Sequence, residues 1–295
     1  MGALHLGHQS LAVLARRECE VVVASIFVNP TQFGPAEDLE KYPRTLQHDL
    51  QLLEKAGVDC VFAPSDPKEM YRERSPLCHV EPAAFSSILE GIARPDFFRG
   101  VATVVTKLFN IIQPSVAYFG QKDISQCILI QRMVRDLDFP IDVRICETLR
   151  EEDGLAMSSR NTYLTAGERK VASVLFCALS AGKNVFESRI KERNERQAAS
   201  SSASSSFIKR EEVVKACEAV LAAEPLVTHV EYISAASAED MCEEMDGWEA
   251  LSSSGFVLSA AIKVGEVRLI DNLLVGSAVD AIFGSTHSPS RVELR

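Results

Sequence analysis

The chain has 295 residues, of which 46% are hydrophobic and 24% are charged, a balance typical of a globular protein. Its formal net charge of −10 argues against general binding to nucleic acid or to an anionic membrane surface, because both require a basic face. The sequence contains no apolar run of about 20 residues, so we expect no membrane-spanning segment.

The first eight residues read MGALHLGH and open a predicted helix. His5 and His8 are three residues apart, which places them on one face of that helix. Helix N-termini attract anions, and Gly2 and Gly7 let the main chain approach a bulky ligand. The segment therefore predicts a phosphate site in which both imidazoles donate hydrogen bonds. The alternative is that both are ordinary surface histidines.

A β-branched run over residues 21–28 predicts a strand that is buried on both faces of a parallel sheet. Gln32 follows it, at the strand end where open α/β sheets bind ligands. Its amide offers a donor and an acceptor to a small polar substrate, although a solvated loop amide is the alternative. We expect a helix over 37–57 with a break at 42–45, and a second strand over 58–63.

The same alternation of strands and helices continues after a proline-rich loop. Helix, strand, turn, helix and strand are predicted over residues 101–112, 116–119, 120–123, 124–137 and 141–149. The turn reads Gly-Gln-Lys-Asp, in which Lys122 suits a phosphate and Asp123 suits a hydroxyl pair or a helix cap. The alternation predicts an α/β fold with a doubly wound, Rossmann-like parallel sheet.

The segment 153–161 reads DGLAMSSRN and places two hydroxyls beside a guanidinium. Arginine presents a planar fork of donors, and serine adds donors without charge. Ser158, Ser159 and Arg160 therefore form a candidate anion clamp, for which a turn with helix-capping serines is the alternative.

The pattern changes after this segment and predicts a smaller α+β domain. Its helices and strands are expected over residues 165–183, 209–223, 228–234, 256–264 and 267–271. We divide the chain into residues 1–149 and 150–295. A serine-rich stretch over 194–207 has too little apolar area to offset the entropy lost on ordering, and is expected to be a flexible insertion.

Eight cysteines are scattered along the chain without a CxxC pair or the Cys/His spacing of a zinc site. This distribution favours reduced thiols and a cytoplasmic location.

Six motifs occur in a fixed order, and together they identify a family resemblance. They are MGALHLGH, SIFVNPTQF, YPRT, FRGVATVVTKLFN, YFGQKD and GLAMSSRNTYL. The chain resembles the pantothenate synthetase (pantoate–β-alanine ligase) family of the HxGH nucleotidyltransferase superfamily. The resemblance covers residues 1–180 and returns at VRLIDN, residues 267–272.

The resemblance implies a ligation in two steps. ATP and pantoate would form pantoyl adenylate and pyrophosphate with Mg²⁺, and β-alanine would then attack the acyl carbon to give pantothenate and AMP. The adenylate is itself the activated acyl donor, so the enzyme needs no nucleophile and mainly excludes water. The family also implies a homodimer, with these small molecules as its substrates.

The resemblance further implies the roles of individual residues. His5, His8 and Lys122 would be catalytic, with His8 as general acid. Gln32 and Gln126 would hold pantoate or β-alanine, and Asp49 would be a neighbour of Mg²⁺. The implied ATP-binding residues are Met1, Gly2, Ala3, Leu4, His5, Leu6, Gly7, His8, Gly120, Gln121, Lys122, Asp123, Leu149, Met157, Ser158, Ser159 and Arg160.

The sequence departs from the family pattern at its start. The first strand of the family, and the Pro-Thr expected before MGALHLGH, are absent, so we expect the strands over 21–28 and 116–119 to flank an empty slot. Two alternatives therefore stay open beside the ligase. One is a truncated, inactive chain or a non-catalytic subunit, and the other is a different HxGH nucleotidyltransferase.

Overall fold

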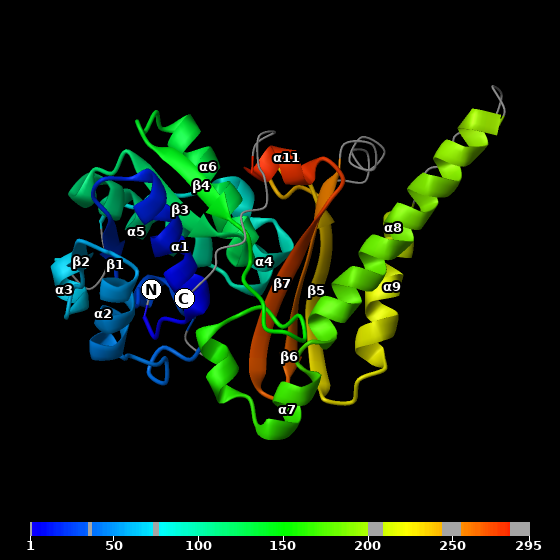
Figure 1. Ribbon diagram of the computed structural model, residues 1–295, viewed down its shortest axis with the longest axis horizontal. Helices are drawn as coiled ribbons and strands as arrows, with labels where there is room; N and C mark the ends of the chain where they lie inside the picture. The colour runs from blue at the N-terminus through cyan, green and yellow to red at the C-terminus, as the bar shows by residue number, and fades with distance from the viewer. Residues whose placement is uncertain (1, 35–36, 73–76, 200–208, 244–254, 284–295) are drawn as a thin grey trace. The chain divides into compact units, whose positions relative to one another are not determined.

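The structure is a computed structural model that describes residues 2–34, 37–72, 77–199, 209–243 and 255–283. Two compact units divide the chain (Figure 1). The first runs to Arg150 and includes Met157–Thr162, and the second comprises Glu151–Ala156 and the described residues from Tyr163 to Phe283. We keep residues 149 and 150 as the proposed domain boundary, with Met157–Thr162 as a segment that returns to the first unit.

The first unit alternates short strands with helices, as the sequence predicts. Its strands are β1 (Val23–Ser25), β2 (Cys60–Phe62), β3 (Val116–Gly120) and β4 (Asp142–Cys146). Its helices are α1 (Leu6–Glu18), α2 (Leu46–Lys55), α3 (Pro67–Met70), α4 (Leu89–Ala93), α5 (Phe97–Ile112) and α6 (Ile124–Asp136). Four short 3₁₀ helices lie over Pro30–Gln32 (η1), Ala83–Ser86 (η2), Gln121–Asp123 (η3) and Ser159–Tyr163 (η4).

The strands of the first unit form two parallel pairs, β1 with β2 and β3 with β4. Val23 aligns with Cys60 in one pair, and Val116 aligns with Asp142 in the other. Within the described residues, no backbone ladder joins the two pairs. Strand β1 is also shorter than the predicted range 21–28. Only Val23–Ser25 pair with β2, which is itself three residues long.

Apolar packing anchors the segments that carry the predicted site. Leu4 lies in a buried cluster with residues of α1, α2 and β1, so the start of the chain is fixed against the parallel pair. Helix α5 is buried along most of its length, and Val101 and Ala102 are fully inaccessible. This burial agrees with the apolar residues found on all sides of that helix in the sequence.

The predicted helix over 37–57 is confirmed only in its second half. Helix α2 begins at Leu46, and the described residues before it are irregular. Pro43 disfavours a helical conformation at the preceding residue. The side chains of Glu37 and Asp38 form ion pairs with Arg94 and Arg160, which are distant in sequence. Tertiary ion pairs and proline thus outweigh the local helical pattern.

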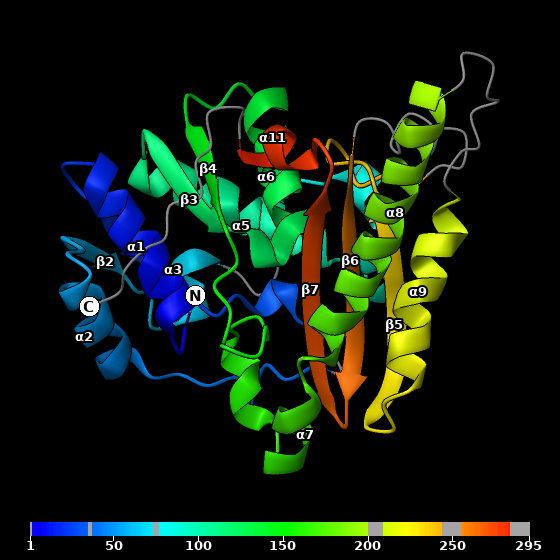
Figure 2. The same cartoon turned by 45° about the vertical axis from the view of Figure 1, so that its right-hand side comes forward.

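The second unit is an antiparallel sheet covered by helices. Its elements are α7 (Ala166–Val171), α8 (Val174–Ala199), α9 (Arg210–Ala222), β5 (Val227–Ala236), β6 (Phe256–Val264), β7 (Val267–Val275) and α11 (Ala278–Phe283). The strand order is β5-β6-β7, and α8 and α9 pack against one face of the sheet (Figure 2). Parallel pairs followed by a smaller antiparallel domain confirm the predicted α/β class.

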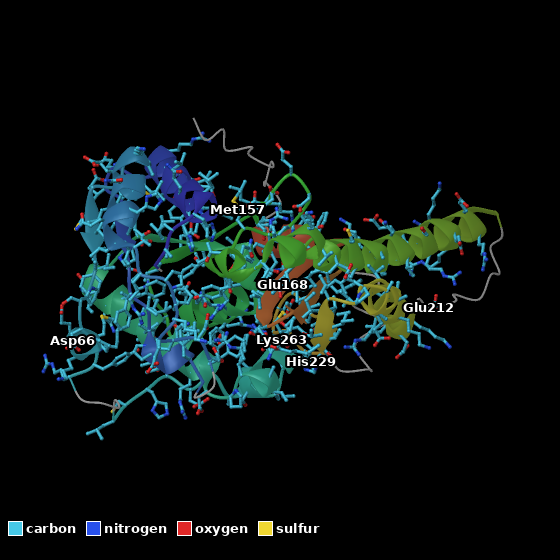
Figure 3. The ribbon with its side chains drawn as sticks, turned by 90° about the horizontal axis from the view of Figure 1, so that it is seen from below. Asp66, Met157, Glu168, Glu212, His229 and Lys263 are labelled. Atoms are coloured by element: carbon cyan, nitrogen blue, oxygen red, sulfur yellow. The ribbon has the colours of Figure 1, made fainter. Side chains whose placement is uncertain are left out.

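Helix α8 continues to Ala199, well past the predicted end at residue 183. Ion pairs one turn apart, such as Lys183 with Glu187, favour this extension. Arg189 also pairs with Glu212 of α9, which Figure 3 labels. The first residues of the predicted flexible insertion, 194–199, are therefore helical, and residues 200–207 lie outside the described part of the chain.

The helices and the cysteines can be compared with what the composition predicts. Over the described part of the chain, every helix is too short or too polar to cross a lipid bilayer. All eight cysteines are free thiols, as their scattered spacing predicts.

We expect Gly182→Ala to destabilise the second unit, because Gly182 permits a close contact between α8 and α9. An added Cβ would lie 2.5 Å from Cys217 Sγ and 3.0 Å from the Val213 carbonyl oxygen. Overpacking of this kind lowers the free energy of unfolding by about 1–3 kcal/mol. Urea denaturation followed by circular dichroism measures the change.

Gly167→Ala in α7 is the matched control, because nothing lies within 4 Å of the added Cβ. Its free energy of unfolding should stay equal to that of the parent or rise by up to about 1 kcal/mol, as alanine favours helix. Equal losses in the two variants would contradict the steric explanation.

Candidate active site

The turn before α1 is held by bonds to its main chain. Ala3 adopts a left-handed conformation with φ of 50°. Asp49 accepts hydrogen bonds from the amides of Ala3 and Leu4, at 3.0 and 2.8 Å. Ser159 donates through Oγ to the carbonyl oxygen of Ala3 at 2.9 Å. Both sides of residue 3 are thus tied to other segments.

The two histidines cap the first turn of α1 with their own rings. His5 Nδ1 accepts from the Gly7 amide at 3.1 Å, and His8 Nδ1 accepts from the His5 amide at 3.3 Å. The ring centroids are 4.0 Å apart. A Cβ on Gly7 would lie 2.9 Å from the His5 ring, so only glycine leaves room for this arrangement. With Nδ1 accepting, each neutral ring is assigned its proton on Nε2.

The surroundings keep both imidazoles neutral. The pKa of His5 is lowered to about 4, mainly by burial and to a smaller extent by the positive charge of Lys122, while Asp123 opposes the shift. Burial, followed by the charges of His5 and Lys122, lowers the pKa of His8 well below the ordinary 6.5. The pair therefore presents two neutral Nε2–H donors near neutral pH.

The Gly-Gln-Lys-Asp turn lies between β3 and α6. The positive charge of Lys122 lowers the pKa of both histidines, so its ammonium group acts on them electrostatically. Lys122 Nζ lies 3.7 Å from Asp123 Oδ2. Asp123 occupies the N-cap position of α6, but its side chain makes no capping hydrogen bond. Cys127 donates to the carbonyl oxygen of Gly120 at 3.2 Å and steadies the turn.

Gln32 is oriented by a buried asparagine that the sequence analysis did not single out. Asn29, only 3% exposed, donates from Nδ2 to Gln32 Oε1 at 2.9 Å and to the Gly100 carbonyl oxygen at 3.3 Å. Tyr71 donates its hydroxyl to Asn29 Oδ1 at 2.9 Å. The bond from Asn29 fixes the orientation of the Gln32 amide, and the described bonds leave its Nε2 hydrogens available as donors.

A glycine of α5 makes this arrangement possible. A Cβ on Gly100 would lie 2.4 Å from the carbonyl oxygen of Thr31, so α5 touches η1 through a position without a side chain. Gln126, the second predicted glutamine, lies half-buried in the first turn of α6. Among the described residues, no hydrogen bond joins it to Gln32.

The segment Met157–Thr162 closes onto the first unit. The Met157 amide donates to the Leu149 carbonyl oxygen at 3.0 Å, and Met157 lies beside α1 (Figure 3). Arg160 forms a bidentate ion pair with Asp38, at 2.9 Å from Nε and 2.7 Å from Nη2. Burial opposes ionisation of Asp38, but the bonds to Arg160 outweigh it and lower the pKa of that carboxyl.

The structure brings some of the predicted site residues together, whereas others are buried, paired or outside the described chain. It brings the histidine turn, Lys122 and Ser159 together. Met1 lies outside the described residues, Asp49 is fully buried, and Arg160 is paired with a carboxylate. Of the other predicted ATP-binding residues, Gly2, Leu4 and Gln121 are buried, Ala3, Gly7, Gly120, Leu149, Met157 and Ser158 are half-buried, and Leu6 and Asp123 are exposed.

Sequence reasoning missed Asn29, Asp38 and Gly100. Asn29 and Gly100 stand inside the motifs NPTQ and FRG, so their positions were visible although their contacts were not. In the part of the chain that the structure covers, no three His, Cys, Asp or Glu side chains gather as a metal site would require.

Comparison with known proteins gives consistent results. A family model described as Pantoate-beta-alanine ligase matches residues 1–274. A pantothenate synthetase of Chloroflexus aurantiacus is 47% identical over 275 residues, covering 93% of this chain and 89% of the relative. One from Chloroflexus aggregans is 48% identical over 276 residues, covering 93% and 91%.

Solved structures agree with the sequence relatives. The crystal structure of pantothenate synthetase from Thermus thermophilus superimposes with a TM-score of 0.79 at 43% identity, covering 94% of this chain and 91% of that one. A pantoate-beta-alanine ligase from Francisella tularensis, complexed with beta-gamma ATP and beta-alanine, has a TM-score of 0.68 at 33% identity and covers 93% and 87%.

The neutral histidines predict a loss of stability in mild acid. In the unfolded chain both titrate near about 6.5, whereas burial lowers their folded pKa values. The unfolded state therefore binds more protons, and the free energy of unfolding falls as the pH drops from about 6.5 towards about 4. Chemical denaturation at a series of pH values measures this slope.

The variant with both His5→Gln and His8→Gln should lose part of the slope. His229→Gln, at an exposed position of β5, is the control and should retain it. Parallel slopes for the double variant and the parent would show that the two rings do not titrate as described.

Proposed function

The chain belongs to the pantoate–beta-alanine ligase family, and on that premise we propose that the turn bearing His5 and His8 is where ATP activates pantoate. The chain catalyses the ATP-dependent ligation of pantoate and β-alanine. The observation that carries the proposal is the pair of neutral imidazoles next to Lys122, at the N-terminus of α1.

The proposed reaction has two steps. A carboxylate oxygen of pantoate attacks the α-phosphorus of ATP, and the bond from that phosphorus to pyrophosphate breaks. The amine of β-alanine then attacks the acyl carbon of pantoyl adenylate, the acyl–oxygen bond to AMP breaks, and the amine loses a proton. Negative charge grows on phosphate oxygens in the first step, so preorganised donors there accelerate it.

His5 and His8 act as neutral hydrogen-bond donors to the phosphate oxygens. Their Nδ1 atoms accept main-chain hydrogens, which leaves Nε2–H as the donor in each ring. A neutral imidazole is a weak proton source, so we assign His8 to hydrogen bonding rather than to the general-acid role that the resemblance implies. Lys122 adds the positive charge that two neutral rings lack.

Gln32 binds pantoate through its Nε2 hydrogens. The support is the bond from Asn29, which fixes the amide in one orientation. A carboxylate or hydroxyl oxygen is the complementary group on the substrate. Gln126 is assigned to the same substrates, although the support for it is only its half-buried place in the first turn of α6 beside the Lys122 turn.

The Met157–Thr162 segment and the residues around Lys122 complete the proposed ATP site. Ser158 supplies a hydroxyl. Asp38 binds Nε and Nη2 of Arg160, and the Nη1 donors on the other side of the guanidinium are assigned to ATP. The main chain from Gly120 to Asp123 and at Leu149 is assigned to the ribose, phosphates and adenine. Met1 is assigned with its turn on the resemblance alone.

Mg²⁺ fits Asp123 better than Asp49. Mg²⁺ prefers one or two carboxylates together with phosphate oxygens. The Asp123 carboxylate is partly exposed and does not cap α6, whereas the oxygens of Asp49 already accept three hydrogen bonds in a fully buried position. When bound, the ion would neutralise charge on the departing pyrophosphate.

We further propose that the enzyme is a cytoplasmic homodimer. The free cysteines support a reducing compartment, and the homodimer rests on family resemblance. The alternatives of an inactive chain or another nucleotidyltransferase are not favoured, because the family match runs through most of the chain.

We expect ATP consumption to require pantoate, and AMP release to require β-alanine as well. The reason is that only the acyl adenylate offers the amine an activated carbon. Chromatography of nucleotides after incubation with each combination of substrates tests this dependence. Rapid AMP release without any amine would contradict the proposed order.

His8→Ala and Lys122→Ala should each lower the rate of pyrophosphate release by about 10²–10³-fold, the usual loss for one transition-state donor. Circular dichroism should show that both variants fold. His229→Ala, at an exposed position of β5, is the control and should keep the parental rate. Losses smaller than about threefold in both variants would refute the assigned roles.

A further inference from the structure

We propose that Asp49 is a positioning residue of the adenylation site, acting on the histidines through the main chain of residues 3 and 4. The inference rests on the proposed function and adds a residue to it. Asp49 comes from the first turn of α2, and α1 and α2 are in contact (Figure 1). Its carboxylate is fully buried, with an exposed fraction of 0%.

Every described bond of this carboxylate serves the turn or its own helix. Oδ2 accepts from the Ala3 amide at 3.0 Å, and Oδ1 accepts from the Leu4 amide at 2.8 Å. Thr45 donates its hydroxyl to Oδ1 at 2.9 Å. The positive end of α2 adds a favourable field for a carboxylate in its first turn. Both oxygens are thus committed to protein donors.

The turn needs such a partner. Ala3 lies in the left-handed region, which is unfavourable for a residue with a Cβ. A buried amide without an acceptor is also unfavourable, and a carboxylate is a stronger acceptor than a neutral group. Asp49 therefore stabilises a main-chain conformation that the local sequence does not favour.

Very few covalent and hydrogen bonds separate the amides that Asp49 holds from the histidine rings. Leu4 is followed directly by His5, whose amide in turn holds the His8 ring. A small shift of the turn therefore moves both Nε2–H donors together. Such a shift weakens contacts that matter mainly in the transition state, so it lowers kcat more than it raises KM.

Asp49→Asn is the direct test. The amide keeps the size of the side chain, but its Nδ2 hydrogens face a main-chain donor and cannot accept from it. We expect kcat to fall about 10–100-fold while KM for ATP and pantoate changes by less than about threefold. Glu54→Gln, an exposed acid on the same helix, is the matched control and should keep the parental kcat.

A double-mutant cycle with His8→Ala separates positioning from a general loss of folding. If Asp49 acts through the histidines, His8→Ala should cost at least about fivefold less in the Asp49→Asn background than in the parent. Fully additive losses would overturn the proposal. If Asp49→Asn does not fold, Thr45→Val removes one supporting donor and should show a smaller loss of kcat with the same non-additivity.

A titration with Mg²⁺ tests the competing role. A positioning residue leaves the Mg²⁺ concentration for half-maximal rate unchanged, and an increase of about tenfold or more in Asp49→Asn would overturn the proposal in favour of metal contact.

The proposed function has its own test, because it fails if the single variant His8→Ala is fully active. Normal activity of Asp49→Asn beside an impaired His8→Ala would refute only the Asp49 proposal.

Discussion

The proposed active site depends on one main-chain turn, residues 2–5, that is held by bonds to other segments of the chain. Residue 3 adopts a left-handed conformation, and its amide and carbonyl oxygen bond to Asp49 and Ser159. The turn places two imidazole rings 4.0 Å apart and directs main-chain hydrogens to both Nδ1 atoms. Burial then keeps the rings neutral, so their tautomer and their donor atoms follow from the conformation of the backbone.

Charge is distributed locally, as an acidic protein that binds ATP requires. The net charge of −10 would repel a triphosphate in general. The proposed site provides local positive charge through Lys122 and the N-terminus of α1. Two arginines nearby are paired with adjacent carboxylates, Arg94 with Glu37 and Arg160 with Asp38. These pairs fix the irregular segment before α2, which leads to Asp49.

Much of the fold could be predicted from local patterns. The strand over 256–264 has the predicted bounds, and α6 and α9 agree with their predictions to within one residue at each end. The predictions failed where distant contacts outweigh local preference. The segment before Leu46 is not helical because its acids pair with distant arginines, and α8 runs to Ala199 beside α9.

For the site, the sequence by itself determined the spacing of His5 and His8, the Lys122 turn and the family, because these depend on neighbouring residues. Only the tertiary structure decided which groups orient them. Arg160 meets Asp38 across 122 residues, Asn29 reaches the Gly100 carbonyl across 71, and Asp49 reaches Ala3 across 46. Such partners are chosen by packing between distant segments, and so is the burial that keeps the histidines neutral. No local pattern encodes either.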